Sequence, residues 1–310
     1  VYGARAAIIG GCLGTSNVET EKLFDIPAKG TMSHSFIMSY DDEYEAFEVY
    51  SKYNPGNLIL LVDTYNTLAS GVPNAIKVFK KLREKGKLPK LYGIGLDSGD
   101  LAYLSKEARR ILDEEGFEDA VVSASSDLDE YLIRDLKLQG SRINLWGVGT
   151  KLITAYDQPA LGAVYKLAQI RRGQEVENKI KISNDPEKIT NPGYKKTVRM
   201  YDKDTHRALA DLIMLEDEEI DTQKPLTIFH PVYTWKKRVL TNFYCKELME
   251  PVIVDGKCVY KTPKIEESQK LLQAEKETMW PGVMRFTNPH EYHVDLSEGL
   301  WNMKNDIINK

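Results

Sequence analysis

Apolar and polar residues follow one another in a repeating order along the first half of the chain. A nearly continuous apolar run is followed by a polar cluster, and this order recurs four times before residue 151. Apolar runs with few polar interruptions are typical of parallel strands that are buried on both faces. The pattern predicts four such strands, at Leu58–Val62, Leu91–Leu96, Ala120–Ala124 and Ile143–Trp146.

The segments around these runs have a helical pattern instead. Apolar residues recur there at three- and four-residue spacing, as at Leu104, Ala108 and Ile111. Repeated strand–helix units predict a parallel sheet with right-handed crossovers. The helices are predicted at Asp42–Lys52, Val72–Lys85, Ser105–Glu115 and Leu128–Leu138.

The pattern changes after about Ile170, where Lys179–Ser183 alternates like a half-exposed strand and further short segments predict an antiparallel sheet. Glu216–Asp221 is expected to be an acidic loop, and Glu266–Glu277 an exposed helix. We therefore predict a barrel domain over residues 1–170 and a smaller carboxyl-terminal domain over 171–310. Its strands are predicted at Lys179–Ser183, Thr197–Tyr201, Ala208–Leu215 and Val232–Leu240.

Composition narrows the class of protein. A chain of 310 residues with 42% hydrophobic and 28% charged residues is ordinary for a soluble globular protein. The net charge of −4 implies no general affinity for nucleic acid or for an acidic membrane, and no apolar run approaches the roughly 20 residues that span a bilayer. Three cysteines form neither a disulfide framework nor a zinc site, which favours a reducing, cytoplasmic location.

The beginning of the sequence reads as the middle of a protein. It opens at Val1 without an initiator Met, and residues 2–10 resemble the last turns of a helix. We therefore expect that an amino-terminal portion precedes this sequence.

Polar clusters follow each predicted strand, and together they predict a ligand site. Because α/β proteins bind ligands at the carboxyl ends of parallel strands, the four clusters suggest one shared site at one mouth of a barrel. The clusters are Asp63–Thr67, Asp97–Asp100, Ser125–Asp127 and Gly147–Thr150.

Two of these clusters suggest contacts with a phosphorylated sugar. Glycines at Gly147 and Gly149 let a backbone approach a phosphate to which Thr150 can donate, although a tight structural turn is an equally good interpretation. Asp97 and Asp100 could bind ribose hydroxyls or magnesium. For Asp100, a cap of the following helix is slightly favoured.

Two further polar turns lie near the start of the chain. A lone histidine such as His34 is more often a structural or surface residue than a catalytic one, and the polar neighbours Thr31 and Ser33 raise the odds of a functional role only modestly. Thr15 and Ser16 lie in a glycine-rich turn whose alternative is a plain loop.

A series of these short motifs, covering essentially the whole chain in one order and spacing, resembles the nicotinate phosphoribosyltransferase family. The motifs are Gly14–Asn17, Gly30–Ser35, Leu61–Thr67, Asp97–Asp100, Trp146–Leu152, Ala155–Gly162 and Lys181–Asn184.

The resemblance implies a fold and a reaction. The fold is α/β: an irregular TIM-like barrel, like that of type II phosphoribosyltransferases, with a smaller, mainly antiparallel α+β domain. The enzyme forms nicotinate mononucleotide and pyrophosphate from nicotinate and phosphoribosyl pyrophosphate, in NAD biosynthesis and salvage. ATP is a co-substrate, hydrolysed through a phosphohistidine, and Mg²⁺ is the cofactor. Family members are usually dimers, so a cytoplasmic homodimer is expected.

The resemblance also implies roles for individual residues. His34 is the phosphohistidine, and Asp97 and Asp100 complete the catalytic set. Nicotinate's carboxylate faces Thr15 and Ser16, whereas no residue is identified as a metal ligand. The other predicted substrate-binding residues, including those for the 5′-phosphate, are Asp63, Thr64, Ser98, Ser126, Asp127, Gly147, Gly149 and Thr150.

The chain departs from the family pattern at two positions. Gly95 stands where the family commonly has Arg, which leaves the base contact on this strand open, and Ser126 replaces a common Asn. Two alternatives therefore remain. One is a phosphoribosyltransferase that uses nicotinamide or quinolinate, and the other is a non-catalytic fragment that binds phosphoribosyl ligands.

Overall fold

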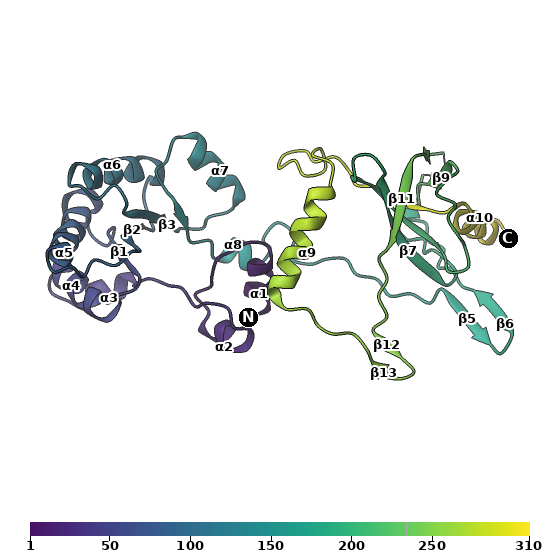
Figure 1. The fold of residues 1–310 in the computed structure, drawn as a ribbon, viewed down its shortest axis with the longest axis horizontal. Helices are drawn as coiled ribbons and strands as arrows, with labels where there is room; N and C mark the ends of the chain where they lie inside the picture. The colour runs from purple at the N-terminus through teal and green to yellow at the C-terminus, as the bar shows by residue number, and fades with distance from the viewer. Residues whose placement is uncertain (234) are drawn as a thin grey trace. The chain divides into compact units, whose positions relative to one another are not determined.

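The computed structural model describes residues 1–233 and 235–310. The chain forms two compact units, Val1–Leu161 and Gly162–Lys310 (Figure 1). The division between them precedes the boundary expected after residue 170.

A parallel four-stranded sheet forms the centre of the first unit. Its strands pair in chain order, with Leu61 beside Gly95 and Leu96 beside Ala124. The predicted α/β class is confirmed, and closure of the sheet into a barrel stays a prediction. The strands are β1 (Leu58–Leu61), β2 (Tyr92–Leu96), β3 (Val121–Ala124) and β4 (Leu145–Trp146).

Amphipathic helices cover one face of this sheet. Leu60, Ile94 and Val122 point to that face from neighbouring strands and are completely buried, together with Phe47 and Phe79 from the helices. Burial of a large apolar side chain stabilises a fold by about 1.5–3 kcal/mol, so this layer holds the strand ends in place. The helices are α4 (Glu43–Tyr53), α5 (Val72–Glu84), α6 (Leu101–Glu114) and α7 (Glu130–Leu138).

Short elements lie at the carboxyl side of the strands. The π-helix η1 (Thr67–Gly71) directly follows the polar cluster after β1. A Cβ on Gly71 would lie 1.9 Å from the carbonyl oxygen of Val62, so only glycine fits this close approach. The other short helices are α1 (Tyr2–Ile9), α2 (Val18–Phe24), α3 (His34–Met38) and α8 (Thr150–Ile153).

The second unit is built on a six-stranded sheet of order β10-β9-β14-β8-β7-β11. All of its pairs are antiparallel except β8 with β14. The strand predicted at Ala208–Leu215 is confirmed as β8, which alternates buried and half-buried positions. The strands are β7 (Lys195–Asp202), β8 (Ala208–Leu215), β9 (Leu226–Phe229), β10 (Lys237–Leu240), β11 (Phe243–Glu247) and β14 (Val294–Leu296).

Smaller elements complete this unit. Helix α9 is exposed as predicted, because none of its residues is buried. The elements are the hairpins β5 (Gln169–Arg172)–β6 (Glu175–Asn178) and β12 (Ile253–Val254)–β13 (Lys257–Cys258), the 3-10 helix η2 (Pro186–Lys188), and helices α9 (Ile265–Thr278) and α10 (Glu298–Ile308).

One strand prediction in this unit is wrong, and another is confirmed only in its last 4 residues. Residues 179–183 form no strand; the backbone of Lys181 instead exchanges hydrogen bonds with Thr190. Only the end of the predicted strand Val232–Leu240 is extended. Before β10, the His230 imidazole accepts two backbone amides at 3.0 and 3.1 Å and holds a turn. Residue 234, in the same prediction, lies outside the described residues.

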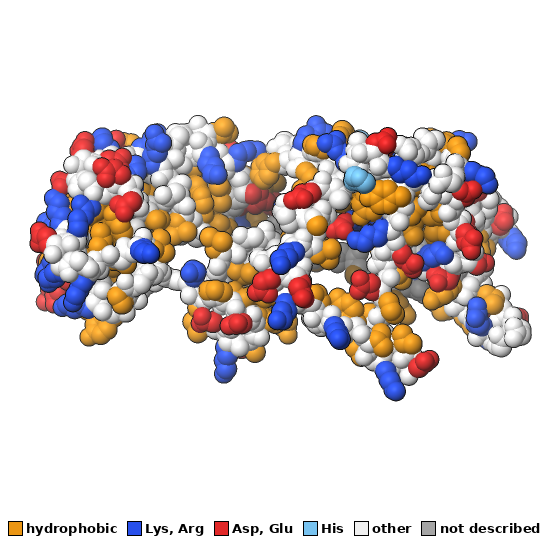
Figure 2. Space-filling view, viewed as in Figure 1, with side chains coloured by type: hydrophobic (Ala, Val, Ile, Leu, Met, Phe, Trp, Pro, Cys, Tyr) orange, Lys and Arg blue, Asp and Glu red, His pale blue; other side chains and the backbone are white. Residues whose placement is uncertain are grey.

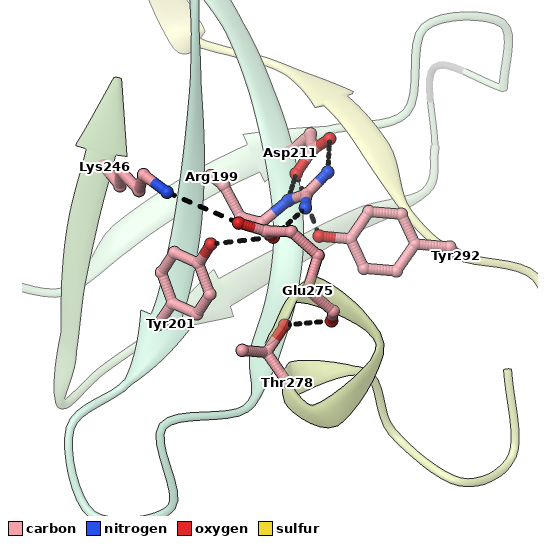
Figure 3. A network of polar contacts seen from close by, with 7 residues as sticks. All are labelled: Arg199, Tyr201, Asp211, Lys246, Glu275, Thr278 and Tyr292. Atoms are coloured by element: carbon pink, nitrogen blue, oxygen red, sulfur yellow. Dashed lines mark hydrogen bonds and ion pairs between the residues drawn. The ribbon is translucent and has the colours of Figure 1, made fainter. Parts of the chain in front are cut away.

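A polar network joins α9 to the sheet of the second unit (Figure 3). Arg199 donates to both carboxylate oxygens of Asp211 at 2.7 and 2.9 Å and to Glu275 at 2.7 Å. The Tyr292 hydroxyl donates to Asp211 at 2.9 Å, and burial raises the pKa of this tyrosine. Because each charge meets an opposite charge or a donor, the network is suited to holding α9 in place.

The surface drawn in Figure 2 carries acidic and basic side chains interspersed, with neither sign dominating. Over residues 1–233 and 235–310, no helix is long and apolar enough to cross a membrane.

Candidate active site at the carboxyl ends of the parallel strands

Three strands of the first unit end side by side and bring their polar residues together. Asp63, Asp97 and Ser125 come just after the ends of β1, β2 and β3. Ser125 donates its backbone N–H to the Leu96 carbonyl at 2.9 Å, which continues the pairing past the strand end. Parallel pairing therefore gathers side chains that are more than 60 positions apart in the sequence.

Asp97 lies at the centre of this cluster. Its Oδ2 is 3.6 Å from Nε2 of His34, and its Oδ1 accepts the Ser125 hydroxyl. Its backbone N–H donates to Asp63 Oδ2 at 2.8 Å. The Asp97 side chain is 41% exposed and that of His34 is 37% exposed. A carboxylate and an imidazole are thus held in place while remaining accessible to a ligand.

His34 is oriented from both sides of its ring. It is the first residue of α3, whose N-terminus is capped by the Ser33 hydroxyl. Nδ1 lies 3.0 Å from the Thr64 hydroxyl, while Nε2 faces Asp97. A carboxylate beside one ring nitrogen favours the proton on that nitrogen, which leaves a lone pair on the other. An imidazole in this form can act as a nucleophile toward a phosphoryl group.

Asp63 is turned toward the neighbouring strand. Its Oδ2 accepts both the Asp97 amide at 2.8 Å and the Ser98 hydroxyl at 2.7 Å. Its Oδ1 is buried and, within the described part of the chain, has no hydrogen-bond partner. This carboxylate therefore links the ends of β1 and β2.

Asp100 caps α6, as the sequence slightly favoured. Its Oδ1 accepts the Tyr103 amide at 2.9 Å, and the residue is exposed. A carboxylate has acceptor capacity on both oxygens, so this cap is compatible with the predicted ribose contact, which stays a prediction.

The predicted phosphate loop begins beside this cluster. Gly147 donates its N–H to the Ala124 carbonyl at 2.8 Å, and its Cα faces Ser125 closely enough that a Cβ would lie 3.4 Å from the Ser125 Cβ. Gly149 and Thr150 are exposed, with open space around the Cβ position of Gly149. The backbone of this loop is therefore accessible to a phosphate.

The neighbouring loop after β3 has an unusual backbone. Ser126 has a φ of 90° and Asp127 a φ of 49°. A non-glycine residue in such a conformation is energetically costly, by about 1–3 kcal/mol, and is found preferentially at ligand sites. Both residues are exposed at the same end of the sheet.

Sequence reasoning missed two features of the site. Ser125 stood in a predicted polar cluster but was given no role, although a hydroxyl residue directly after β3 is the available signal. Lys151 follows the phosphate loop, and its ammonium lies 2.6 Å from Asp129, which caps α7. The lysine lowers the pKa of the Asp129 carboxyl, and the carboxylate raises the pKa of Lys151. A cation is therefore held close to the loop.

The predicted residues for the pyridine lie elsewhere in the first unit. Thr15 pairs with Ala28 and accepts the Asn17 amide at 3.1 Å, while Ser16 is exposed. No hydrogen bond among the described residues joins Thr15 or Ser16 to the strand-end cluster, so their role stays a prediction. Gly95 is buried in β2, where a Cβ would make an ordinary 3.5 Å contact with Leu61.

The acidic side chains of the site can be compared with those that a bound magnesium ion requires. The described residues contain no group of three or more His, Cys, Asp or Glu side chains that could hold a metal. Magnesium is commonly bound through one or two carboxylates together with substrate phosphates. The half-exposed Asp97 fits that mode, in which the pyrophosphate itself supplies most of the ligands.

Sequence comparison relates the whole chain to one enzyme family. Residues 194–304 match the family model described as nicotinate phosphoribosyltransferase C-terminal domain. Nicotinate phosphoribosyltransferase of Bacillus subtilis is 50% identical over 310 residues, which are 100% of this chain and 62% of the relative. The Caenorhabditis elegans enzyme of the same name is 33% identical, over 96% of this chain and 62% of the relative.

Structural comparison agrees at the level of the fold. Human nicotinic acid phosphoribosyltransferase has a TM-score of 0.76 and 24% identity, covering 98% of this chain and 66% of that one. Nicotinate-nucleotide pyrophosphorylase from Pyrococcus furiosus has a TM-score of 0.60 and 22% identity, over 88% of this chain and 61% of that one. The chain spans about three fifths of the length of these relatives. The resemblance seen in the motifs is confirmed.

Proposed function

We propose that this chain, a relative of the nicotinate phosphoribosyltransferases along its whole length, carries the phosphoribosyl-transfer site of such an enzyme. The reaction joins nicotinate to phosphoribosyl pyrophosphate and releases pyrophosphate, giving nicotinate mononucleotide for NAD biosynthesis and salvage. The single observation that carries the proposal is that Asp63, Asp97 and His34 meet at the strand ends of a chain 50% identical to an enzyme of this name.

The chemistry matches a carboxylate-lined site. The pyridine nitrogen forms a bond to the anomeric carbon while the bond from that carbon to the pyrophosphate oxygen breaks, and the electron pair leaves with pyrophosphate. The ribose is positively charged in the transition state, so the Asp97 carboxylate is suited to stabilise it. Asp100, which follows the same strand, is proposed to orient the ribose hydroxyls.

The phosphate groups have separate proposed contacts. The exposed backbone of Gly147, Gly149 and Thr150 would bind the 5′-phosphate, with Lys151 as a nearby cation. Magnesium, when bound, would neutralise charge on the pyrophosphate. Thr15 and Ser16 are proposed for the carboxylate of nicotinate.

ATP coupling is proposed to act through His34. Its ring has one nitrogen beside Asp97 and the other beside a hydroxyl that can move away. That second nitrogen would take the γ-phosphoryl group of ATP, with ADP leaving, and water would later take the phosphoryl group from the histidine. The enzyme is further proposed to act as a homodimer.

The test is synthesis by the full-length protein. Labelled nicotinate, phosphoribosyl pyrophosphate, ATP and magnesium should give nicotinate mononucleotide and pyrophosphate in equal amounts. Nicotinamide and quinolinate, added in competition, should be poor substrates. If labelled nicotinate is never converted under any magnesium and ATP condition, the function is wrong. Preference for either competitor would favour the corresponding phosphoribosyltransferase instead.

A further inference from the structure

The Asp63 carboxylate, in the cluster at the strand ends, accepts its hydrogen bonds from the protein itself. Asp63 Oδ2 accepts hydrogen bonds from the backbone of Asp97 and from the Ser98 hydroxyl, the first two residues after β2. Its Oδ1 is buried. In this arrangement Oδ2 already accepts two hydrogen bonds from the protein and Oδ1 is enclosed, although the family resemblance placed Asp63 among the substrate-binding residues.

The backbone that carries Asp63 is itself fixed. The preceding residue, Val62, is fully buried and donates its N–H to the Gly95 carbonyl at 3.1 Å. Its carbonyl packs against Gly71, where a Cβ would lie at 1.9 Å. The Asp63 carboxylate is therefore a rigid attachment point for the less regular end of β2.

Asp97 depends on this attachment for its orientation. The Asp63 bond fixes the backbone of Asp97, and the Ser125 hydroxyl fixes one of its carboxylate oxygens. The other oxygen is thereby directed at His34. Loss of the Asp63 acceptor would free the backbone of Asp97 and leave one side-chain contact from the neighbouring strand.

We propose that Asp63 is a positioning residue that clamps the end of β2, so that Asp97 is presented to His34 and to the ribose. The inference rests on the proposed function for its kinetic consequence, while the clamp itself concerns only the protein. What Asp63 supplies is an acceptor at a defined point. Its negative charge is not required at the reacting atoms.

Three substitutions in the full-length protein separate the acceptor from the charge. Asp63→Asn keeps an acceptor oxygen in place but removes the charge. Asp63→Glu keeps the charge but moves the acceptor by one methylene, and Asp63→Ala removes both. We expect Asp63→Asn to retain kcat within about tenfold, whereas Asp63→Ala and Asp63→Glu lose about 100-fold, as expected when a reacting group is misplaced.

The loss should fall on kcat more than on the KM for phosphoribosyl pyrophosphate, because Asp97 acts in the transition state. If Asp63→Asn loses as much activity as Asp63→Ala while Asp63→Glu retains it, Asp63 acts through its charge and the proposal is wrong. The comparison of Asn with Glu holds even if the Ala variant does not fold.

Amide hydrogen exchange provides a readout that needs no turnover. The Asp97 amide should be protected in wild type and in Asp63→Asn but should exchange much faster in Asp63→Ala. Ser98→Ala is the matched control, because it removes one bond to Asp63 and leaves the Asp97 amide bonded. Equal Asp97 exchange in wild type and Asp63→Ala would overturn the clamp. If wild type makes no nicotinate mononucleotide, the proposed function fails, and the exchange measurement still decides the clamp.

Discussion

The two ends of the parallel sheet in the first unit use polar residues in opposite ways. At the carboxyl ends, His34 and Asp97 are more than a third exposed and face each other across 3.6 Å. At the amino ends, the Tyr92 hydroxyl donates to Asp119, and Tyr92 is 2% exposed. Nearby, Arg109 donates to the Ala120 carbonyl at 2.6 Å, to the Phe117 carbonyl and to Asp113.

The difference separates residues that bind a ligand from residues that hold the fold. At the amino ends, charged and polar groups meet their partners beside an aromatic cluster of Phe79, Tyr92 and Phe117. At the carboxyl ends, the side chains are oriented by their neighbours but remain accessible to a ligand. In α/β proteins with parallel strands, chemistry is found at the carboxyl ends and stability at the amino ends.

The second unit contains a further polar network, which stabilises the fold and does not form part of the candidate site. Arg199 is paired with Asp211 and Glu275, and its side chain is only 16% exposed (Figure 3). Hydrogen bonding to Asp211 is the main reason that the pKa of Arg199 is raised. Paired charges alone therefore do not identify an active site; accessibility is needed as well.

The largest expected effect comes from removing the imidazole at the carboxyl ends. His34→Asn keeps a polar side chain near Thr64 but cannot be phosphorylated. We expect ATP hydrolysis and the acid-labile phosphoprotein to be abolished, while slow ATP-independent synthesis of nicotinate mononucleotide survives because Asp97 and the phosphate loop are unchanged. The measurement is ADP formed per mononucleotide.

A matched control exists in the second unit. His206 is an exposed histidine with a φ of 56°, a conformation that asparagine tolerates, so His206→Asn should leave the ADP ratio unchanged. If a folded His34→Asn variant also keeps the wild-type ratio, His34 has only a structural role.

The second prediction concerns the amino ends of the strands. Arg109→Met fills a similar volume but leaves the buried Ala120 carbonyl without its donor. The Phe117 carbonyl loses one of two donors and keeps the Ala120 amide at 3.1 Å. Because one buried unsatisfied group costs about 1–3 kcal/mol and one further lost hydrogen bond about 1 kcal/mol, we expect the free energy of unfolding to fall by roughly 3 kcal/mol. The kcat of the folded fraction should not change. Denaturant unfolding and kinetics on the same samples provide the measurement.

Arg110 on the same helix is the control, because it is 54% exposed and pairs with the carboxylates of Glu107 and Glu114 at the surface. Arg110→Met should leave the unfolding midpoint nearly unchanged. A fall in kcat with unchanged stability in Arg109→Met would contradict the division of roles between the two sheet ends.

Periodicity predicted the repeated strands and helices of the first unit because burial sets both patterns. It placed Asp63, Asp97 and Ser126 at strand ends for the same reason. The partners of these residues could not be predicted, since the bond from Asp97 to Asp63 joins positions 34 apart. Pairing between strands depends on register, which a single sequence does not specify.

The misassigned segments of the second unit have a related cause. Lys179–Ser183 alternates as a strand does, yet the Lys179 amide donates to the Ala168 carbonyl and Lys181 exchanges hydrogen bonds with Thr190. In Val232–Leu240, the His230 imidazole competes for the amides of the turn. Local side-chain acceptors therefore replaced the sheet pairing that alternation suggests.

The third prediction returns to the carboxyl ends. Gly149→Val adds a branched side chain where the structure has open space around the Cβ position. The same side chain would block a phosphate from the backbone, and we expect the Kd for phosphoribosyl pyrophosphate to rise by about 10- to 100-fold, roughly 1.4–2.7 kcal/mol. Calorimetry on the folded variant measures this change.

Gly56→Val is the control for the third prediction, because Gly56 also has open space at its Cβ position but lies in the turn before β1. Its binding constant should equal that of wild type. An unchanged Kd in Gly149→Val would remove this loop from the site.

The smallest expected effect is at Tyr92, and it depends on pH. Burial, followed by the bond to Asp119, raises the pKa of Tyr92 to about 12, whereas an unfolded tyrosine titrates near 10. The fold thus favours the neutral form, so this contribution to stability is complete below pH 10 and is lost as pH rises from about 10 to 12. Tyr92→Phe should cost about 1 kcal/mol at neutral pH, for one hydrogen bond, and should lack this alkaline loss. The unfolding free energies of wild type and variant, plotted against pH, should therefore converge above pH 10.

Tyr103→Phe, at an exposed tyrosine of α6, is the control and should follow wild type throughout. If the difference in unfolding free energy between Tyr92→Phe and wild type stays constant from about pH 7 to about pH 11.5, Tyr92 is not held neutral by the fold.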